Sequence, residues 1–196
     1  MKINKFLLAT KNKNKLREIR EILRINIPII SLLEISPQIE IEENGETFRE
    51  NAFIKASTCF RKFKIPSISD DSGLEIDALN GKPGIHSARF APTNKERIEK
   101  VLNLLKDIPF EKRTARFRCA VCLFISENEH YFFEGKIEGY IAFEPKGNNG
   151  FGYDPIFYLP EYKKTLAQLP LSEKNKISHR FKAFSKLAEF LHKYLK

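Results

Sequence analysis

Hydrophobic residues alternate between two spacings along the whole chain, and this alternation limits the fold more than any other feature. Residues 3–9 are mostly apolar and are predicted to form a buried strand. The apolar positions that follow have helical spacing: Leu16, Ile19, Leu23 and Ile27. Strand and helix patterns interleave to the C-terminus without a linker or an internal repeat. The sequence predicts an α/β fold, as a single domain over residues 1–196 or as one domain with two lobes.

Further signals fix the expected order of elements. Capping boxes at Thr47 and Thr93 predict the starts of two helices, and a last helix is expected from near Ser178. A strand over residues 65–69 is expected to end in a sharp turn at residues 70–73, since glycine permits one. Residues 114–125 and 130–141 flank a polar turn and predict a long antiparallel hairpin. We therefore expect a mixed central sheet flanked by helices.

Charge and composition exclude some classes of protein. The hydrophobic runs are short and broken by charges, which argues against a membrane span and a signal peptide, so we expect a cytoplasmic protein. The 34 basic residues exceed the 25 acidic ones and give a net charge of +9. This surplus favours polyanionic partners such as nucleotides, nucleic acid or acidic membranes, but biased genome composition explains it equally well.

The cysteines do not form a metal-binding pattern. Cys119 and Cys122 lie three residues apart on a predicted strand, and such neighbours point to opposite faces. With Cys59 the number of cysteines is odd, and we expect three reduced thiols.

The segment from Thr10 to Lys15 joins the first strand to the first helix, where free backbone N–H groups attract anions. Lysines at this end of a helix are unfavourable by roughly 0.3–1 kcal/mol each. The three lysines here are better explained if a phosphate chain binds beside them. The alternative is a solvated, lysine-rich surface.

Two acidic pairs offer hard oxygen ligands. Asp70-Asp71 follows the predicted strand and Glu42-Glu43 precedes the second helix. Such ligands suit magnesium, which binds a few carboxylates and keeps water and substrate phosphate in its shell. The alternative is that both pairs are solvated loop residues.

A glycine-rich segment, residues 147–155, carries Phe151 and Tyr153. Its glycines permit a close approach to a flat ligand on which the rings stack. In the alternative, it is a hairpin turn whose rings complete the core. Lys174, His179 and Arg180 lie near the start of the last helix, where a cap neighbour and a surface charge are the ordinary roles for the last two.

Taken in order, these segments resemble the Ham1/inosine triphosphatase family over nearly the whole chain. The family's opening pattern of Ser or Thr, then Asn, then Lys is met by Thr10, Asn12 and Lys15. The remaining family segments appear here as Glu50-Asn51-Ala52 with Lys55, Asp70-Asp71-Ser72-Gly73, Pro83-Gly84 with Ser87-Ala88-Arg89, Gly150-Phe151-Gly152-Tyr153-Asp154-Pro155, and Ser178-His179-Arg180.

The resemblance implies the ITPase-like fold of Maf and Ham1 proteins, with an active-site cleft between two lobes. It implies hydrolysis of ITP, dITP and XTP between the α and β phosphates, with Mg²⁺ as cofactor, which cleanses the nucleotide pool. It also implies a homodimer. From the sequence itself, we expect neither a membrane nor a stable nucleic-acid partner.

The same resemblance implies a role for each matching residue. Glu42 and Asp71 would hold the metal, and Asp71 would also orient and deprotonate the attacking water. The triphosphate would bind to Thr10, Lys11, Asn12, Lys13, Asn14, Lys15, Lys55 and Ser72. The base would contact Phe151, Gly152, Tyr153, Asp154, Lys174, His179 and Arg180.

Three departures from the family pattern leave the fine substrate preference open. Lys11 replaces a glycine, His86 stands where tyrosine is more frequent, and Asn148-Asn149 replaces a smaller pair. Two alternatives also remain: a Maf-like pyrophosphatase acting on dUTP or modified pyrimidine triphosphates, and a basic nucleic-acid-binding module.

Overall fold

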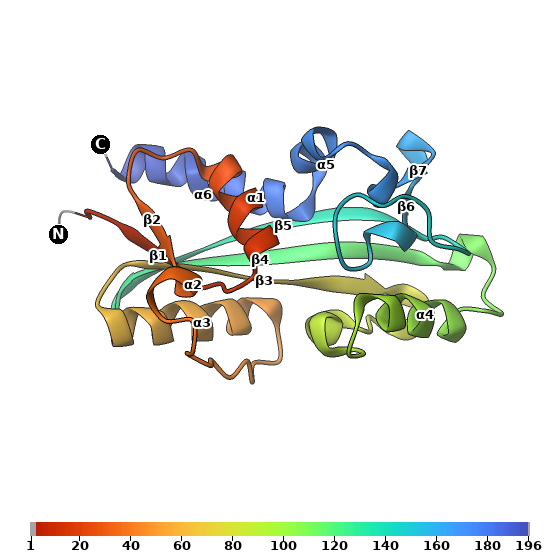
Figure 1. Ribbon diagram of the computed structural model, residues 1–196, viewed down its shortest axis with the longest axis horizontal. Helices are drawn as coiled ribbons and strands as arrows, with labels where there is room; N and C mark the ends of the chain where they lie inside the picture. The colour runs from red at the N-terminus through yellow and green to blue at the C-terminus, as the bar shows by residue number, and fades with distance from the viewer. Residues whose placement is uncertain (1–2, 196) are drawn as a thin grey trace. The chain divides into compact units, whose positions relative to one another are not determined.

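The computed structural model describes residues 3–195 and contains a seven-stranded mixed sheet in the order β2-β1-β3-β4-β5-β6-β7 (Figure 1). Strand β1 lies parallel to both β2 and β3, whereas β6 is antiparallel to β5 and β7. The predicted α/β class is confirmed. The strands are β1 (Phe6–Leu8), β2 (Ile29–Ser31), β3 (Ser67–Ile76), β4 (Thr114–Ser126), β5 (Glu129–Ile141), β6 (Phe157–Leu159) and β7 (Lys164–Thr165).

Two helices begin where the sequence places capping boxes. The Thr47 and Thr93 hydroxyls accept hydrogen bonds from the N–H groups of Glu50 and Glu96, at 3.1 and 3.2 Å. The α-helices are α1 (Lys13–Leu23), α2 (Leu32–Ile35), α3 (Phe48–Phe63), α4 (Asn94–Leu104), α5 (Leu171–Ile177) and α6 (His179–Tyr194). Short 3₁₀ turns are η1 (Asp77–Leu79), η2 (Gly84–Arg89), η3 (Phe110–Lys112), η4 (Asp154–Ile156), η5 (Pro160–Tyr162) and η6 (Leu166–Gln168).

The chain forms two compact units, and β3, β4 and β5 contribute residues to both. Within the described residues, unit 1 runs up to Asp71 and adds Cys119–Gly135 and the chain from Arg180 onward. Unit 2 consists of Ser72–Arg118 and Lys136–His179.

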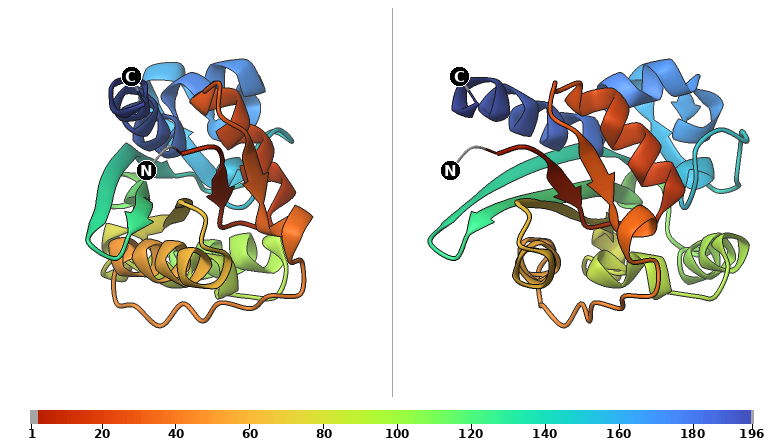
Figure 2. Two further views of the ribbon diagram at one scale, coloured as in Figure 1. Left: turned by 90° about the vertical axis from the view of Figure 1, so that its left-hand side faces the viewer. Right: turned by 60° about the vertical axis from the view of Figure 1, so that its left-hand side comes forward.

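Unit 1 has three layers. Apolar side chains of α1 and α6 pack on one face of its strands, around Phe6, Ile68 and Val121. Helix α3 packs on the other face, where Ala52 and Ala56 contact Phe124. Figure 2 shows α3 on the side of the strands opposite to α1 and α6. Apolar side chains of α1, α3 and α6 therefore cover the strands of unit 1.

Unit 2 is built around a single cluster of buried side chains. Ile98 and Val101 of α4 join Leu74 and Ile76 of β3, and Phe157 of β6 belongs to the same cluster. The 3₁₀ turn η6 adds further apolar residues. This core holds the glycine-rich segment between β5 and β6.

Two sequence expectations about the backbone are wrong. Helix α1 ends at Leu23, because Arg24 adopts a left-handed conformation, so Ile27 lies outside the helix. Strand β3 continues through residues 70–73 instead of turning there. The carboxylates of Asp70 and Asp71 are buried and have cationic partners, so this acidic segment does not need a solvated turn.

The expectation of three reduced thiols is confirmed. All three cysteines are free and buried, with Cys119 in the core shared with α1 and α6 and Cys122 in the core shared with α3. Burial raises the pKa of both Cys59 and Cys122 to about 12. Over residues 3–195, no helix is both long and apolar enough to cross a membrane.

Candidate active site

Two adjacent carboxylates at the middle of β3 define the candidate site in unit 1. Asp70 and Asp71 are 3% and 7% exposed. Successive residues of a strand point to opposite faces, and the partners of the two carboxylates follow this rule. Asp70 contacts residues of α1 and α6, whereas Asp71 contacts residues of α3.

Asp70 belongs to a buried ionic network. Its Oδ2 lies 2.9 Å from Lys15 Nζ and 3.8 Å from Arg180 Nε. Arg180 Nη1 also donates to Glu18 Oε2 at 2.5 Å, so this guanidinium bridges two carboxylates. Burial alone would raise the pKa of Asp70, but Lys15, Arg180 and Lys55 together hold it well below its usual range. The geometry favours an ionised Asp70 that fixes Lys15 and Arg180.

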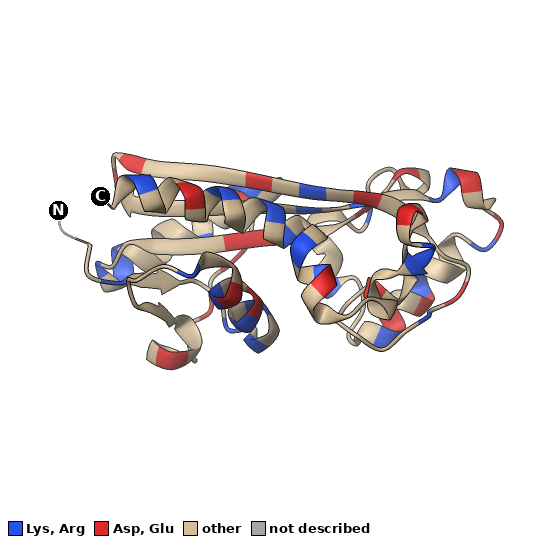
Figure 3. Cartoon of the chain, turned by 90° about the horizontal axis from the view of Figure 1, so that it is seen from above, with Lys and Arg blue, Asp and Glu red and all other residues tan. Residues whose placement is uncertain are grey.

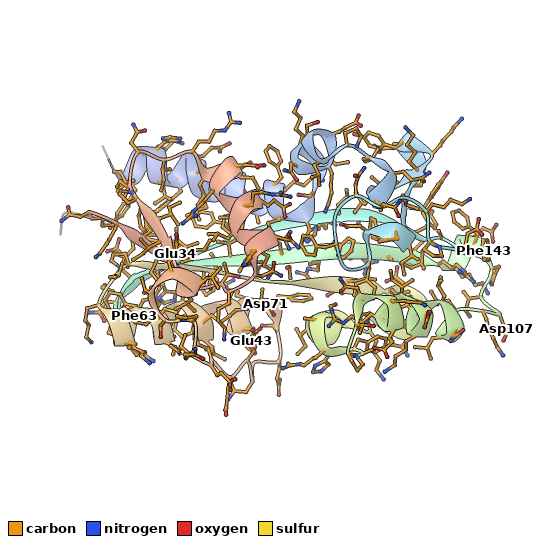
Figure 4. The ribbon with its side chains drawn as sticks, viewed as in Figure 1. Glu34, Glu43, Phe63, Asp71, Asp107 and Phe143 are labelled. Atoms are coloured by element: carbon orange, nitrogen blue, oxygen red, sulfur yellow. The ribbon has the colours of Figure 1, made fainter. Side chains whose placement is uncertain are left out.

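Asp71 has a different environment. Its Oδ1 lies 3.5 Å from Lys55 Nζ, and its Oδ2 accepts a hydrogen bond from Asn51 Nδ2 at 3.2 Å. Lys55 also donates to Glu43 Oε2 at 3.0 Å, so one ammonium group contacts two carboxylates. Figure 4 labels the two residues that carry these carboxylates, Glu43 and Asp71. Burial raises the pKa of Asp71 despite the nearby lysines. The same burial would lower the pKa of Lys55, but Asp71, Asp70 and Glu43 raise it.

These carboxylates fit a divalent cation in the manner that magnesium prefers. Among the described residues, no group of three or more His, Cys, Asp or Glu is arranged to hold a metal ion. Magnesium usually binds through one or two carboxylates and completes its shell with water and phosphate. Glu43 and Asp71 supply hard oxygen donors around one shared positive charge. Glu42, which the sequence analysis selected, is exposed on the same loop.

The loop before α1 has the geometry of a helix N-terminus. Asn12 caps the helix through its side chain, which accepts from the N–H groups of Asn14 and Lys15. Thr10 Oγ1 accepts from the Asn12 N–H at 3.1 Å, and Lys11 Nζ donates to the carbonyl of Ile39. Lys13 and Asn14 are exposed. Lysines and N–H groups together make this loop suitable for an anion.

In unit 2, the glycine-rich segment is held by a buried ion pair. Asp154 Oδ2 lies 2.6 Å from Lys174 Nζ and accepts from the Phe151 N–H at 2.8 Å. Gly150 has a φ of 79°, and a Cβ atom there would meet Asp154 Oδ2 at 2.1 Å. Glycine is therefore required for this loop to close around the ion pair.

The two rings of this segment have different surroundings. Tyr153 is 4% exposed, and its hydroxyl donates to the carbonyl of Ser87 at 2.9 Å, so its ring lies in the core of unit 2. Phe151 is half-buried, with Lys174 Nζ 5.0 Å from its ring centre. The placement of Tyr153 thus agrees with the alternative in which the ring completes the core instead of stacking on a ligand. Phe151 is the ring suited to stack on a ligand.

The remaining predicted residues are placed as follows. His179 is buried and stacks on Phe117 in unit 2, with ring centres 4.9 Å apart. Gly152 has a φ of 67° and open space where a Cβ would stand. Ser72 is half-buried on β3, next to Asp71 in the chain. The predicted residues therefore form one group in unit 1 and another in unit 2.

Sequence analysis missed two residues with a clear place in the unit 1 group. Glu18 is 6% exposed, and Asn51 is fully buried. The available signal for Glu18 was a charged residue between the apolar positions Leu16 and Ile19 of an amphipathic helix. For Asn51 it was an amide inside a family motif, four residues before Lys55.

Comparison with known proteins places the chain in a family. The model of the Ham1 family matches residues 6–190. The dITP/XTP pyrophosphatase of Halalkalibacterium halodurans is 50% identical over 193 residues, which cover 96% of this chain and 100% of the relative. The dITP/XTP pyrophosphatase of Dictyoglomus thermophilum is 52% identical over 195 residues, which cover 97% and 95%.

Solved structures agree with this assignment. A HAM1 protein from Coxiella burnetii has a TM-score of 0.91 and 44% identity, covering 97% of this chain and 100% of that one. The Staphylococcus aureus Ham1 protein has a TM-score of 0.89 and 39% identity, covering 97% and 99%. The chain therefore belongs to the Ham1 family.

Proposed function

We propose that this chain hydrolyses the deaminated purine nucleoside triphosphates ITP, dITP and XTP to the monophosphate and pyrophosphate. The proposal is supported by 50% and 52% identity to two dITP/XTP pyrophosphatases over almost the whole chain. The observation that carries it is the buried Asp71 carboxylate, which shares the Lys55 ammonium with Glu43. A carboxylate in such a position can align water beside a bound cation.

Unit 1 supplies the groups for the triphosphate and the metal in this proposal. Glu43 and Asp71 would hold Mg²⁺, with Glu42 on the same loop as a further candidate ligand. Bound Mg²⁺ would neutralise charge on the phosphate oxygens. The N–H groups and side chains of residues 10–15 bind phosphate, and Lys55 adds a positive charge. Ser72, the first residue of unit 2, is assigned to the phosphates as well.

The reaction requires three actions from these side chains. Lys15 and Lys55 offset the charge that develops on the phosphoryl group under attack. Asp71 orients the attacking water and accepts its proton. A cation bound beside Asp71 would favour the ionised form of its carboxylate, which is the form that accepts a proton.

Unit 2 supplies most of the groups for the base. Phe151 stacks on the purine, and Gly152 permits a close approach of the backbone. Asp154, Lys174 and His179 lie at the edge of the base, whereas Tyr153 supports the loop from the core. Arg180 acts from a position fixed by its ion pair with Glu18.

Selection of the base follows from hydrogen-bond chemistry. Hypoxanthine and xanthine carry an exocyclic oxygen acceptor where adenine carries an amino donor. Donors from Lys174, His179 or Arg180 would be left unpaired by adenine. A mismatch of this kind can reject an analogue by about 10⁴-fold.

The distribution of charge disfavours the nucleic-acid-binding alternative. Such a module needs basic residues clustered on one face or along one element. Figure 3 shows basic and acidic residues interleaved along the helices and strands in view. Basic residues are therefore not confined to one helix or strand in this view.

The test is pyrophosphate release from a panel of nucleotides with and without Mg²⁺. We expect rapid, Mg²⁺-dependent release from ITP, dITP and XTP, with ATP slower by about 10³-fold or more. Preference for dUTP or another pyrimidine triphosphate would instead support the alternative of a Maf-like pyrophosphatase. Absence of hydrolysis across the panel would reject the proposal.

We further propose that the enzyme is a cytoplasmic homodimer. The cytoplasm contains the free nucleoside triphosphates that the reaction consumes. Light scattering coupled to gel filtration tests the assembly, with the mass of two chains expected. A monomer at working concentration would contradict it.

A further inference from the structure

Asn51 is a fully buried polar side chain to which the proposed reaction gives no role. It lies on α3, four residues before Lys55, and its side chain is 0% exposed. Its Oδ1 accepts a hydrogen bond from the Gly45 N–H at 2.9 Å, and its Nδ2 donates to Asp71 Oδ2 at 3.2 Å. One amide therefore connects the loop that carries Glu43 to the carboxylate of Asp71.

The bond to Asn51 distinguishes the two oxygens of Asp71. Oδ2 accepts from the Asn51 amide, whereas Oδ1 faces Lys55 Nζ at 3.5 Å. The donor and acceptor of an amide group lie in one plane, so each bond restricts the direction of the other. The Asp71 carboxylate is thereby held in one rotation, with Oδ1 directed towards the positive charge shared with Glu43.

The Gly45 side of this arrangement is equally tight. A Cβ atom at Gly45 would lie 2.7 Å from Glu50 Cβ and 2.9 Å from Asn51 Oδ1. Glycine therefore allows the loop backbone to reach the amide. The next two N–H groups, of Glu46 and Thr47, donate to Glu50 Oε2 at 2.7 and 3.2 Å. The first turns of α3 thus hold three successive N–H groups close after Glu43.

We propose that Asn51 is a positioning residue that sets Glu43 and Asp71 at the separation needed to share one divalent cation. This inference rests on the proposed function, in which these two carboxylates hold the metal. Partners of metal-binding carboxylates typically change metal affinity or activity by about 10–100-fold when they are mutated. Asn51 would act through both carboxylates at once.

Three variants separate the parts of this role. Asn51→Ala removes both hydrogen bonds. Asn51→Asp keeps an acceptor for the Gly45 N–H but loses the donor to Asp71. Gly45→Ala leaves the amide intact and displaces the loop. Ser57→Ala is the matched control, because Ser57 is a buried polar residue of α3 that bonds to the Ile54 carbonyl of its own helix.

The first readout is Mn²⁺ binding to the full chain without nucleotide, measured by calorimetry. Asn51→Ala and Gly45→Ala should each weaken Mn²⁺ binding by about tenfold or more, whereas Ser57→Ala stays within about twofold. The second readout is hydrogen exchange at the Gly45 amide. Exchange should accelerate about tenfold or more in Asn51→Ala but stay near the wild-type rate in Asn51→Asp.

The third readout is turnover of ITP at saturating Mg²⁺. Asn51→Asp should lower kcat by about tenfold or more, because a second carboxylate oxygen replaces the donor facing Asp71. Together, the three readouts distinguish positioning from a general loss of stability, which would affect Ser57→Ala as well.

Wild-type Mn²⁺ affinity and wild-type Gly45 exchange in Asn51→Ala would overturn the inference. Equal losses in Asn51→Ala and Ser57→Ala would also overturn it. If Asn51→Ala does not fold, Asn51→Asp and Gly45→Ala test the inference instead. Wild-type turnover and wild-type Mn²⁺ binding in both of these variants would refute the inference. Failure of the proposed function looks different, because the wild type would then bind Mn²⁺ and hydrolyse none of the nucleotides.

Discussion

Asp70 and Asp71 are chain neighbours with similar burial, but the pKa values of their carboxylates are shifted in opposite directions. Asp70 lies among Lys15, Arg180 and Lys55, which hold its pKa well below the usual range. Asp71 shares Lys55 with Glu43, and burial raises its pKa. The charge of Asp70 is therefore compensated within the fold, whereas that of Asp71 is compensated only in part. We therefore expect Asp70 to stabilise the fold and Asp71 to be available to a ligand.

The largest expected effect is the loss of kcat in the variant Asp71→Asn. Asp71 is proposed to orient and deprotonate the attacking water, so its loss should lower kcat for ITP by about 10²–10⁴-fold. The pKa of Asp71 is raised on folding, so its ionised form disfavours the folded state at neutral pH. Urea unfolding at neutral pH should therefore give Asp71→Asn a free energy of unfolding equal to or above that of the wild type. A near-normal kcat would remove the catalytic assignment.

Asp70→Asn should have the opposite profile. It leaves the buried Arg180 and the half-buried Lys15 beside a neutral group, and breaking a buried ion pair costs about 3–5 kcal/mol. The urea midpoint should fall accordingly. If Asp70→Asn instead retained full stability and lost only activity, the division of roles between the two carboxylates would be wrong.

The pH dependence of stability provides a further test. The pKa of Asp70 is lowered on folding, so its contribution is fully present above the unfolded pKa of about 3.9. The contribution is lost as the pH falls through the folded pKa. The difference in free energy of unfolding between wild type and Asp70→Asn should therefore be constant from pH 7 to about pH 5 and shrink below about pH 4. A difference that grows towards low pH would contradict the assigned direction.

A smaller effect is expected at Lys15. Lys15→Met removes one of the cations beside Asp70 but leaves Arg180 in place, and the Lys15 side chain is 18% exposed. The free energy of unfolding should fall by about 1–2 kcal/mol, less than for Asp70→Asn. The KM for ITP should rise, since the same ammonium is proposed to bind phosphate. A KM equal to that of the wild type would reject the phosphate-binding role of Lys15 and leave only its ion pair with Asp70.

The smallest effect separates the two rings of unit 2. Tyr153→Phe removes the hydrogen bond to the Ser87 carbonyl, which should lower the free energy of unfolding by about 1 kcal/mol. The KM for ITP should stay within about twofold of wild type, because the ring itself lies in the core. A large change in KM would return Tyr153 to the group of base-stacking residues.

Sequence patterns predicted the larger elements because these have a clear periodicity. The capping boxes at Thr47 and Thr93 located two helix starts, and the long strands of the hairpin carry enough alternation to be recognised. Strands β2, β6 and β7 have two or three residues, too few for a pattern. These short strands are determined by pairing with neighbours distant in the chain.

The turn expected at residues 70–73 failed for a physical reason. Paired aspartates followed by serine and glycine are typical of turns. Aspartate and serine side chains hydrogen-bond to nearby backbone groups there, and glycine adopts the required backbone angles. Here Asp70 and Asp71 find their cations 55 and 16 residues earlier, at Lys15 and Lys55. Partners so distant in the chain cannot be predicted from the local sequence. For the same reason, the ion pair of Glu18 with Arg180, 162 residues later, was not predicted.

Analysis of the products formed from ITP tests the proposed reaction most directly. Phosphorus NMR of wild-type reactions with Mg²⁺ should show IMP and pyrophosphate, and Asp71→Asn should form neither at a comparable rate. Formation of IDP and inorganic phosphate by the wild type would contradict cleavage between the α and β phosphates. Equal product formation by Asp71→Asn would contradict the role given to that carboxylate.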